Sequence, residues 1–284
     1  MKLNTMLCSQ TPTLSFEVFP PKNTAAFEAV KAATEIIAAL RPDFMSVTYG
    51  AGGSNSKATI EVAGNLSSKG IPIVAHLTCV GADRQTLARQ LVQMKQAGVD
   101  NIMALRGDLP EGCELGEFRY ASDLIRFIRE NGDFCIGGAC YPEVHPESAN
   151  QAQDLQYLKQ KVDCGCDYLV TQMFFDNSIF YNFLYKARDI GIQVPILPGI
   201  MPITRASQVD RAAKLSGTNV PARLRQIVDK FGDNPAAMMQ AGIAYATDQI
   251  VDLLANGVNH IHVYSMNKPM VAAKILQNIS ELVR

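Results

Sequence analysis

Glu17, in the stretch S-F-E-V-F-P-P, is a carboxylate with apolar neighbours. Phe16 and Phe19 flank it, and an apolar environment raises the pKa of a carboxyl group. A carboxylic acid with a raised pKa can donate a proton near neutral pH. The alternative is a structural carboxylate paired with a lysine, which is costly inside a buried strand. We therefore predict that Glu17 is a general acid.

Further polar stretches follow apolar runs along the chain. They are V-T-Y-G-A-G-G from Val47, A-H-L-T-C from Ala75, A-L-R-G-D-L-P from Ala104, Y-P-E-V-H-P from Tyr141, T-Q-M-F-F-D from Thr171 and V-Y-S-M-N-K from Val263. In a barrel of alternating strands and helices, catalytic residues lie at or just beyond the C-terminal strand ends. If these runs are strands of one barrel, their polar ends meet on one rim and predict a site there.

Several of these side chains also have structural interpretations. Arg106 and Asp108 could pair with each other, whereas Gly107 between them suggests that the backbone approaches a flat or anionic group closely. Three more could be ordinary members of the core: His76, His145 and Tyr141.

His260 and His262 form an H-x-H pattern, which on a strand places both side chains on one face. A zinc-dependent hydrolase barrel would want this pattern on its first strand together with further ligands. We therefore expect a mostly structural role and predict no metal site.

The seven cysteines form no C-x-x-C pair and follow no signal peptide. This pattern favours a reducing, cytoplasmic location.

Two common phosphate-binding signatures are absent from the sequence. There is no G-x-x-x-x-G-K-[S/T] loop and no strand followed by G-x-G-x-x-G; Gly50, Gly52 and Gly53 match neither spacing. A barrel can hold phosphates through helix N-termini and scattered basic side chains instead. Asp154 and Lys161, on the helix predicted after the fifth strand, are candidates for a ribose hydroxyl and a pyrophosphate. Taken alone, each would more often be an ordinary solvated helix charge.

The composition limits the classes of partner. The 284 residues are 48% hydrophobic and 19% charged, with a net charge of −1, which is typical of a globular protein. Basic residues are scattered, so nucleic acid, whose phosphates need a concentrated basic surface, is not an expected partner. No apolar run approaches the roughly 20 residues of a bilayer span, so we expect no membrane insertion.

Apolar runs recur about every 30 residues, a spacing typical of repeated strand and helix units. The predicted strands are Leu14–Phe19, Phe44–Thr48, Ile71–Thr78, Asn101–Leu105, Phe134–Ala139, Tyr168–Met173, Val194–Pro198 and Asn259–Tyr264. Helical segments between them include Thr24–Leu40, Arg84–Ala97, Ser122–Glu130, Ala149–Val162 and Ala236–Ala255. Left-handed glycines are expected to end the helices at Gly70, Gly98, Gly132, Gly165, Gly191 and Gly257.

Eight such buried parallel strands predict a single (β/α)8 barrel domain over residues 1–284. A doubly wound sheet is the alternative. The stretch after the seventh strand is longer than one unit and predicts two or three helices, with breaks at Pro221 and Pro235. This insertion could cover the barrel mouth.

The polar stretches, together with P-G-I-M-P from Pro198, closely resemble those of bacterial methylenetetrahydrofolate reductases in order and spacing. The resemblance runs from about Ser15 to Lys268. It implies a (β/α)8 barrel that binds FAD, takes hydride from NADH or NADPH, with NADH favoured, and reduces 5,10-methylenetetrahydrofolate to 5-methyltetrahydrofolate for methionine synthesis. It also implies a homotetramer.

The resemblance assigns roles to individual residues. Glu17 is the expected acid that opens the folate ring, Asp108 is the second catalytic group, and Thr48 contacts the nicotinamide. The expected FAD-binding residues are Tyr49, Ala51, His76, Arg106, Gly107, Asp108, Ala121, Tyr141, His145, Asp154 and Lys161. The expected folate-binding residues are Glu17, Asp108, Gln172, Gln208 and Lys268.

The chain departs from the bacterial pattern at a few positions. Lys268 stands where relatives often have arginine, which replaces a planar bidentate contact by a point charge. Tyr157 and Gln160 lie where some relatives offer more hydrogen-bonding or basic groups to FAD.

Two other functional classes stay open. A flavin-free barrel lyase or aldolase would want a Schiff-base lysine within a strand, and the predicted strands contain none. A non-enzymatic folate-binding protein would not need Glu17 and Asp108 together.

Overall fold

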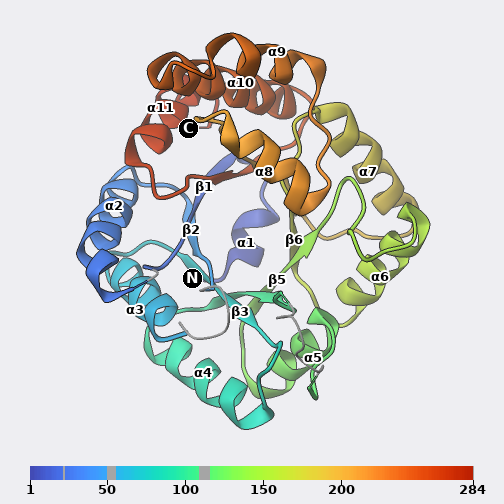
Figure 1. The fold of residues 1–284 in the computed structure, drawn as a ribbon. Coiled ribbons are helices and arrows are strands. Elements are labelled where there is room, and N and C mark those ends of the chain that lie inside the picture. Colours follow the sequence, from blue (N-terminus) through green and yellow to red (C-terminus); the bar gives the residue numbers. More distant parts are fainter. Residues whose placement is uncertain (22, 50–55, 109–115, 284) are drawn as a thin grey trace.

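A ring of parallel strands forms the centre of the computed structural model, which describes residues 1–21, 23–49, 56–108 and 116–283 (Figure 1). The strands are β1 (Thr13–Val18), β2 (Phe44–Val47), β3 (Ile73–Thr78), β4 (Asn101–Leu105), β5 (Cys135–Cys140), β6 (Tyr168–Thr171), β7 (Ile196–Leu197), β8 (Gly199–Ile200) and β9 (His260–Tyr264). The sheet order is β7-β6-β5-β4-β3-β2-β1-β9-β8. Because β7 and β8 are consecutive pieces of one segment, the two ends of this order meet. The predicted (β/α)8 barrel is confirmed, and a doubly wound sheet is excluded.

The seventh predicted strand, Val194–Pro198, is divided in the structure. Pro198 lies between β7 and β8 and has no N–H to donate to a ladder. β7 therefore pairs only with β6, and β8 pairs with β9. The Pro198 carbonyl accepts the His262 N–H at 3.1 Å, and the Gly199 N–H donates to Thr171 Oγ1 at 2.9 Å. The divided segment is thus tied to both neighbours.

Helices surround the ring (Figure 1). They are α2 (Phe27–Ala39), α3 (Ser56–Ser67), α4 (Arg84–Gln96), α5 (Ala121–Asn131), α6 (Gln151–Asp163), α7 (Asn177–Asp189) and α11 (Pro269–Ile279). The predicted helices are present with ends shifted by one or two residues, except that Thr24–Leu40 begins with a separate 3-10 turn, η1 (Thr24–Ala26). In the described ranges, no helix has both the length and the apolar character needed to cross a membrane.

The segment between β8 and β9 holds α8 (Ser207–Ser216), α9 (Ala222–Phe231) and α10 (Pro235–Ala255), which confirms the expected two or three helices. Pro221 precedes α9 and Pro235 begins α10. Proline is tolerated there because the first N–H groups of a helix have no intrahelical partner. Figure 1 places α8 close to the central opening of the ring, whereas α9 and α10 lie at its periphery.

Left-handed glycines end most of the helices for which they are expected. Five of them, Gly70, Gly98, Gly165, Gly191 and Gly257, have φ between +77° and +109°. The prediction is wrong for Gly132, whose φ of −176° is extended backbone. A Cβ at this position would lie 2.5 Å from the Phe134 ring, so Gly132 serves close packing rather than a left-handed turn.

The short helix α1 (Leu3–Leu7) lies at the end of the barrel where the strands begin. Leu3 and Leu7 are buried in a cluster with the inward-facing residues Phe44, Val74, Met103, Tyr168 and Leu197. Asn101 fixes the helix, because its Oδ1 accepts the Leu3 N–H at 2.8 Å and its Nδ2 donates to the Ile73 carbonyl at 3.0 Å. The helix therefore plugs this end of the barrel.

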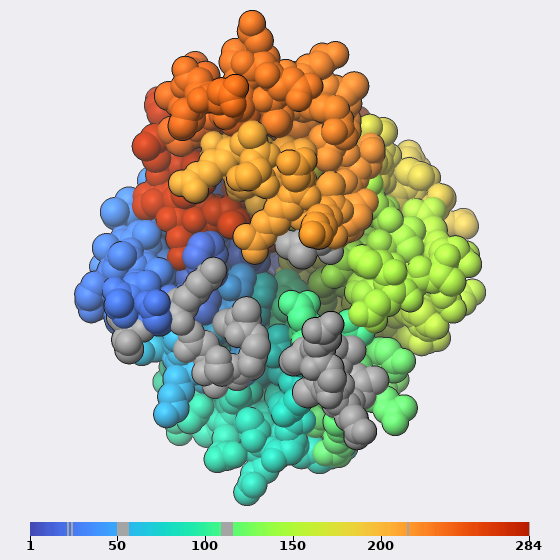
Figure 2. Space-filling view, in the orientation of Figure 1, coloured from blue at the N-terminus to red at the C-terminus, as the bar shows by residue number. Residues whose placement is uncertain are grey.

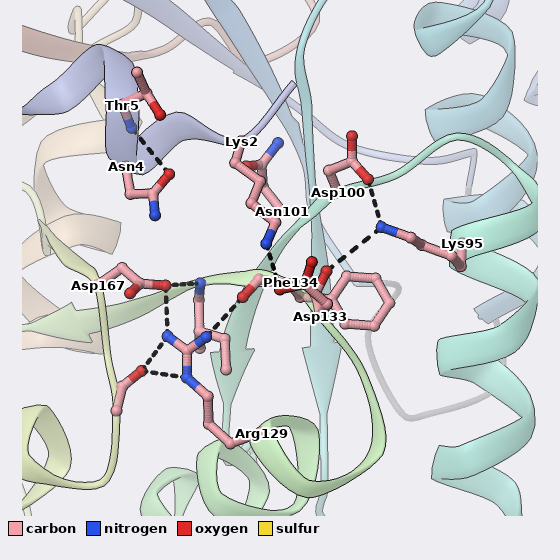
Figure 3. A network of polar contacts seen from close by, with 12 residues as sticks. Lys2, Asn4, Thr5, Lys95, Asp100, Asn101, Arg129, Asp133, Phe134 and Asp167 are labelled. Carbon is pink, nitrogen blue, oxygen red and sulfur yellow. Dashed lines mark hydrogen bonds and ion pairs between the residues drawn. The ribbon is translucent and has the colours of Figure 1, made fainter.

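Figure 3 shows the polar contacts around this end. Arg129 donates to Asp167 Oδ2 at 2.6 Å and to the Phe134 carbonyl at 2.8 Å. Lys95 donates to Asp100 Oδ1 at 2.6 Å. These residues join α4 and α5 to the segments that enter the strands. Charged networks at the N-terminal strand ends of a barrel stabilise the fold rather than carry chemistry.

Gly242 of α10 touches the backbone of the loop that leads into α8. A Cβ on Gly242 would lie 1.6 Å from the Ile203 carbonyl oxygen, which cannot rotate away as a side chain could. We expect Gly242→Ala to displace α10 and to lower the free energy of unfolding by about 2–3 kcal/mol, measured as a lower Tm. Gly116→Ala is the matched control, since no described atom lies within 4 Å of a Cβ there. Equal melting temperatures for the two variants would contradict this expectation.

Candidate active site

A cavity of about 1180 Å³ opens at the C-terminal ends of the strands, on the face shown in Figure 2. It brings together most of the predicted site residues: Glu17, Thr48, Tyr49, His76, Arg106, Gly107, Asp108, Ala121, Tyr141, His145, Asp154, Lys161 and Gln172. Gln208 and Lys268 do not line the cavity. Ala51 lies outside the described residues.

Glu17 lies on the inward side of β1 between two histidines. Its Oε2 is 3.4 Å from His76 Nε2 and 3.7 Å from His262 Nε2, and Ser46 Oγ donates to the same oxygen at 3.4 Å. The Glu17 side chain is only 20% exposed, so these groups replace most of the water around the carboxylate. His76 Nε2 is buried and makes no hydrogen bond to a described residue.

The pKa of Glu17 is lowered, which corrects the expectation of a raised value. Burial raises this pKa, but hydrogen bonding to His262 and Ser46 and the proximity of His76 lower it by more. Burial lowers the pKa of His76 itself, although the charge of Glu17 opposes that shift. Phe16 contributes no apolar wall, because successive strand residues face opposite sides and Phe16 packs in the main hydrophobic core.

The two histidines of the H-x-H pair have different surroundings: His260 lies near the end plugged by α1, and His262 lies beside Glu17 at the cavity. His260 shares hydrogen bonds with Thr13 Oγ1 and the Leu7 carbonyl, each at 3.0 Å, which agrees with a structural role. His262 is fully buried but meets Glu17. The strand pattern places His262 two residues nearer the C-terminal end of β9, and this signal could have identified it as a site residue.

His262 is held on both sides of its ring. Ser15 Oγ donates to the Ile261 carbonyl at 3.0 Å, so it accepts the bond from His262 Nδ1 at 2.7 Å. Nε2, on the other side of the ring, faces Ser46 Oγ at 3.2 Å and Glu17 Oε2 at 3.7 Å.

Arg106 pairs with Glu147 rather than with Asp108. Its two terminal nitrogens donate to the two Glu147 oxygens at 2.6 and 2.5 Å, and hydrogen bonding to Glu147 raises the pKa of Arg106. Asp108 is exposed at the cavity wall. Gly107 has φ +90°, and a Cβ there would lie 3.1 Å from the Thr78 side chain, so glycine is needed for both conformation and space. Sequence reasoning missed Glu147, although it follows the Y-P-E-V-H-P stretch directly.

The loop that follows β5 is held by Asp154 of α6. Asp154 accepts the His145 N–H at 3.2 Å and the Ser148 hydroxyl at 2.9 Å, so it already serves the loop that forms the wall. The Glu147 N–H donates to His145 Nδ1 at 3.1 Å, which places the proton of the neutral ring on Nε2. Val144 has φ +79°, a strained conformation for a β-branched residue. The loop is thus fixed with a donor available on His145.

Lys161 reaches from α6 toward β5. Its amine donates to the Ala139 carbonyl at 2.7 Å, and its side chain packs over Gly138, where a Cβ would lie 3.1 Å from Lys161 Cδ. Burial lowers the pKa of this amine. An ammonium has three donors, so two remain for a ligand in the cavity.

Three further predicted residues are anchored through their backbone or hydroxyl groups. The Thr48 N–H donates to the Val18 carbonyl at 2.9 Å, and the Gln172 N–H donates to the Cys140 carbonyl at 2.7 Å. Tyr49 accepts a hydrogen bond from Gln90 at 3.0 Å. Tyr264, which sequence reasoning missed, also lines the cavity and donates to the Thr171 carbonyl at 2.6 Å. These hydrogen bonds hold the lining residues to neighbouring strands and helices.

The wall combines two kinds of chemistry. Arg106, His145 and Lys161 supply N–H donors along the β4–β6 side, and Glu17 with its histidines supplies a proton-transfer group on the β1–β9 side. Within the described ranges, no group of His, Cys, Asp and Glu is arranged to hold a metal ion. The arrangement suits an anionic, planar cofactor beside a substrate that must be protonated.

The sign of the pKa shift at Glu17 can be measured through stability. A carboxyl whose pKa is lowered in the folded state contributes stability above its unfolded pKa, and that contribution is lost as the pH falls through the folded pKa. We expect the stability advantage of the wild type over Glu17→Gln to be full above about pH 5 and to shrink as the pH falls below it. Denaturant unfolding at several pH values measures it. If the stability advantage of the wild type instead grew as the pH fell, the pKa of Glu17 would be raised, as the sequence suggested.

A family model described as methylenetetrahydrofolate reductase matches residues 2–280. "Methylenetetrahydrofolate reductase (NADH) 1" of Arabidopsis thaliana is 36% identical over 93% of this chain. This chain spans about half of the plant relatives it matches, 48% of the Arabidopsis protein. "5,10-methylenetetrahydrofolate reductase" of Escherichia coli (strain K12) is 34% identical over 94% of this chain and 90% of its own length.

Solved structures give the same fold. A protein of Clostridium thermocellum, described as binding two copies of 5-methyl-5,6,7,8-tetrahydrofolic acid, aligns over 99% of both chains with a TM-score of 0.71 and 16% identity. The α-subunit of tryptophan synthase from Pyrococcus furiosus aligns over 95% of this chain and 99% of its own, with a TM-score of 0.57 and 12% identity. At these identities the likeness shows the barrel alone. The family model and the bacterial relatives decide the assignment: the chain belongs to the methylenetetrahydrofolate reductase family.

Proposed function

We propose that this protein reduces 5,10-methylenetetrahydrofolate to 5-methyltetrahydrofolate, with FAD as bound cofactor and NADH as hydride donor. The observation that carries the proposal is the buried carboxylate of Glu17, held beside His76 and His262 at the wall of a cavity of about 1180 Å³ in a chain of this family. Plant relatives whose names specify NADH support NADH over NADPH.

The residues of the β4–β6 side fit FAD. Arg106, His145 and Lys161 offer N–H donors to its phosphates and polar ring edge, and the left-handed Gly107 allows the backbone to approach a flat ring. Asp108 lies beside them at the wall. When bound, FAD would supply the ring that carries hydride between the two substrates.

Glu17 would supply the proton. Methylenetetrahydrofolate becomes a good hydride acceptor once N10 is protonated and its five-membered ring opens to a cationic iminium. Glu17 is ionised in the protein without ligands, but ligands that fill the cavity remove the remaining water and thereby raise the pKa of Glu17. The carboxylate of Asp108 would stabilise the positive charge of the iminium.

One cavity would serve nicotinamide and folate in turn, so we expect ping-pong kinetics. The described strands contain no lysine, which disfavours a Schiff-base lyase or aldolase. A homotetramer remains a prediction from the resemblance, and a cytoplasmic location remains a prediction from the cysteine pattern.

Cofactor binding is tested at Lys161. We expect the purified protein to be yellow, with one FAD per chain, and Lys161→Met to weaken FAD binding about tenfold or more, because a charge-assisted contact is lost. Lys159→Met is the matched control, since Lys159 lies on the same helix but pairs with Asp163 at 2.5 Å. Absorbance and FAD titration measure the effect. A colourless protein that cannot be reconstituted with FAD would overturn the proposed function.

The role of Glu17 is tested by separating the half-reactions. Glu17→Gln keeps size and hydrogen-bonding reach but cannot donate the proton, so stopped-flow should show near-normal reduction of the flavin by NADH. Oxidation of the reduced flavin by methylenetetrahydrofolate should slow by about 10²–10⁴-fold. Glu130→Gln, on the exposed face of α5, is the control. Equal losses in both half-reactions would indicate a structural role for Glu17 instead.

A further inference from the structure

Gln90 is a buried polar side chain of α4 that no step of the proposed reaction uses. The buried face of α4 consists of Leu87, Gln90, Leu91 and Met94, at the spacing of an amphipathic helix. Gln90 is 7% exposed, so an amide occupies a position whose neighbours along the helix face are apolar. Its Nε2 donates to the Tyr49 hydroxyl at 3.0 Å, whereas its Oε1 is buried and has no hydrogen-bond partner among the described residues.

This arrangement is unfavourable for folding alone. A buried acceptor without a partner costs more free energy than one neutral hydrogen bond contributes, so an apolar side chain of similar size would pack on this helix face at least as well. An amide at this position therefore calls for a reason other than stability.

Gln249 of α10 shows what a buried structural glutamine looks like in the same protein. It is 6% exposed, and its Oε1 also has no partner among the described residues. Its Nε2, however, donates to two groups, the Phe174 carbonyl at 3.3 Å and Asn177 Oδ1 at 3.2 Å. These bonds tie α10 to the segment that leads into α7, away from the cavity lining.

Gln90 and its partner Tyr49 both line the cavity. The Tyr49 ring packs against the main hydrophobic core, and the preceding residue, Thr48, is held through its N–H to the Val18 carbonyl. Tyr49 is thus fixed at its base by β1 and at its hydroxyl by α4. The elements that follow around the ring supply Arg106 after β4 and Lys161 on α6 to the same cavity.

We propose that Gln90 is a positioning residue for FAD, which holds the Tyr49 hydroxyl where the cofactor meets it. This inference rests on the proposed function, in which Tyr49 is one of the FAD-binding residues. A tyrosine side chain can swing about χ1, and a bond at its far end opposes that movement. A contact that is already ordered before the cofactor binds costs less conformational entropy on binding.

The test compares Gln90→Met with Gln249→Met as the matched control. Methionine is unbranched and fills a similar space but has no amide. The dissociation constant of FAD is measured from the loss of flavin when the holoenzyme is diluted. Gln90→Met should weaken FAD binding by about 3–10-fold, whereas Gln249→Met should bind FAD as the wild type does.

Tyr49→Phe tests whether Gln90 acts through the hydroxyl. This variant should weaken FAD binding by itself. The double variant should bind FAD no more weakly than Tyr49→Phe alone, because both substitutions break the same hydrogen bond. If Gln90 served only to pack α4, the two effects would multiply, and that result overturns the inference.

The remaining outcomes separate the alternatives. Unchanged FAD binding in Gln90→Met, or an equal loss in Gln249→Met, overturns the positioning role. Unchanged FAD binding in Tyr49→Phe overturns it even if Gln90→Met does not fold. The rate of flavin reduction is also measured against NADH concentration. If Gln90→Met raises the NADH concentration that gives half the maximal rate and leaves FAD binding unchanged, the pair serves the nicotinamide substrate and the FAD assignment is wrong. A wild type that cannot be loaded with FAD overturns the proposed function and this inference together.

Discussion

Closure of the parallel ring at Pro198 is the constraint on which the site depends. All strand ends of a parallel barrel face one way, and β9 pairs directly with β1, so residues from β1, β3 and β9 share one wall although the chain separates Glu17 from His262 by most of its length. Pro198 cannot complete a ladder, and the two short strands on either side of it each bond one neighbour. Without that closure, β9 would lack the partner β8, and the contact between His262 and Glu17 would lose its support on one side.

The carboxylate at this wall shows how burial and hydrogen bonding compete. Burial alone would favour the neutral acid, as the sequence suggests, but the groups that the ring places around Glu17 favour the anion by more. Because these effects oppose each other, the pKa of Glu17 is sensitive to further loss of water around the carboxylate. In the proposed reaction its protonation would follow ligand binding, which would restrict proton delivery to the loaded site. Asp108 differs from Glu17 in burial, because its side chain is exposed at the wall of the same cavity.

The strands, the rim motifs and most lining residues could be predicted, because continuous apolar runs and polar strand ends are local signals. Contacts between distant segments could not. The partner of Arg106 depends on the path of the loop after β5, which brings Glu147 closer than Asp108. The pKa of Glu17 depends on His262, which lies beside it only because β9 pairs with β1 from the other end of the chain. Gly132 looks like any helix-ending glycine in the sequence, yet its requirement comes from the Phe134 ring. The family resemblance supplied roles that spacing alone could not.

The two sides of the rim differ in how their basic side chains are partnered, and Lys268, after β9, shows the difference. A lysine makes one compact charge with three donors, whereas an arginine presents a planar fork. Lys268 donates one hydrogen bond to Thr204 Oγ1, and Thr204 in turn donates to Gln208. The loop before α8, rather than a carboxylate of the protein, therefore sets the position of the Lys268 amine. Gly242 of α10 packs directly against the backbone of that loop at Ile203. The inserted helices therefore position a lysine whose remaining donors have no acidic partner in the described chain. The β4–β6 side differs, because Glu147 and Asp154 already engage its arginine and its loop.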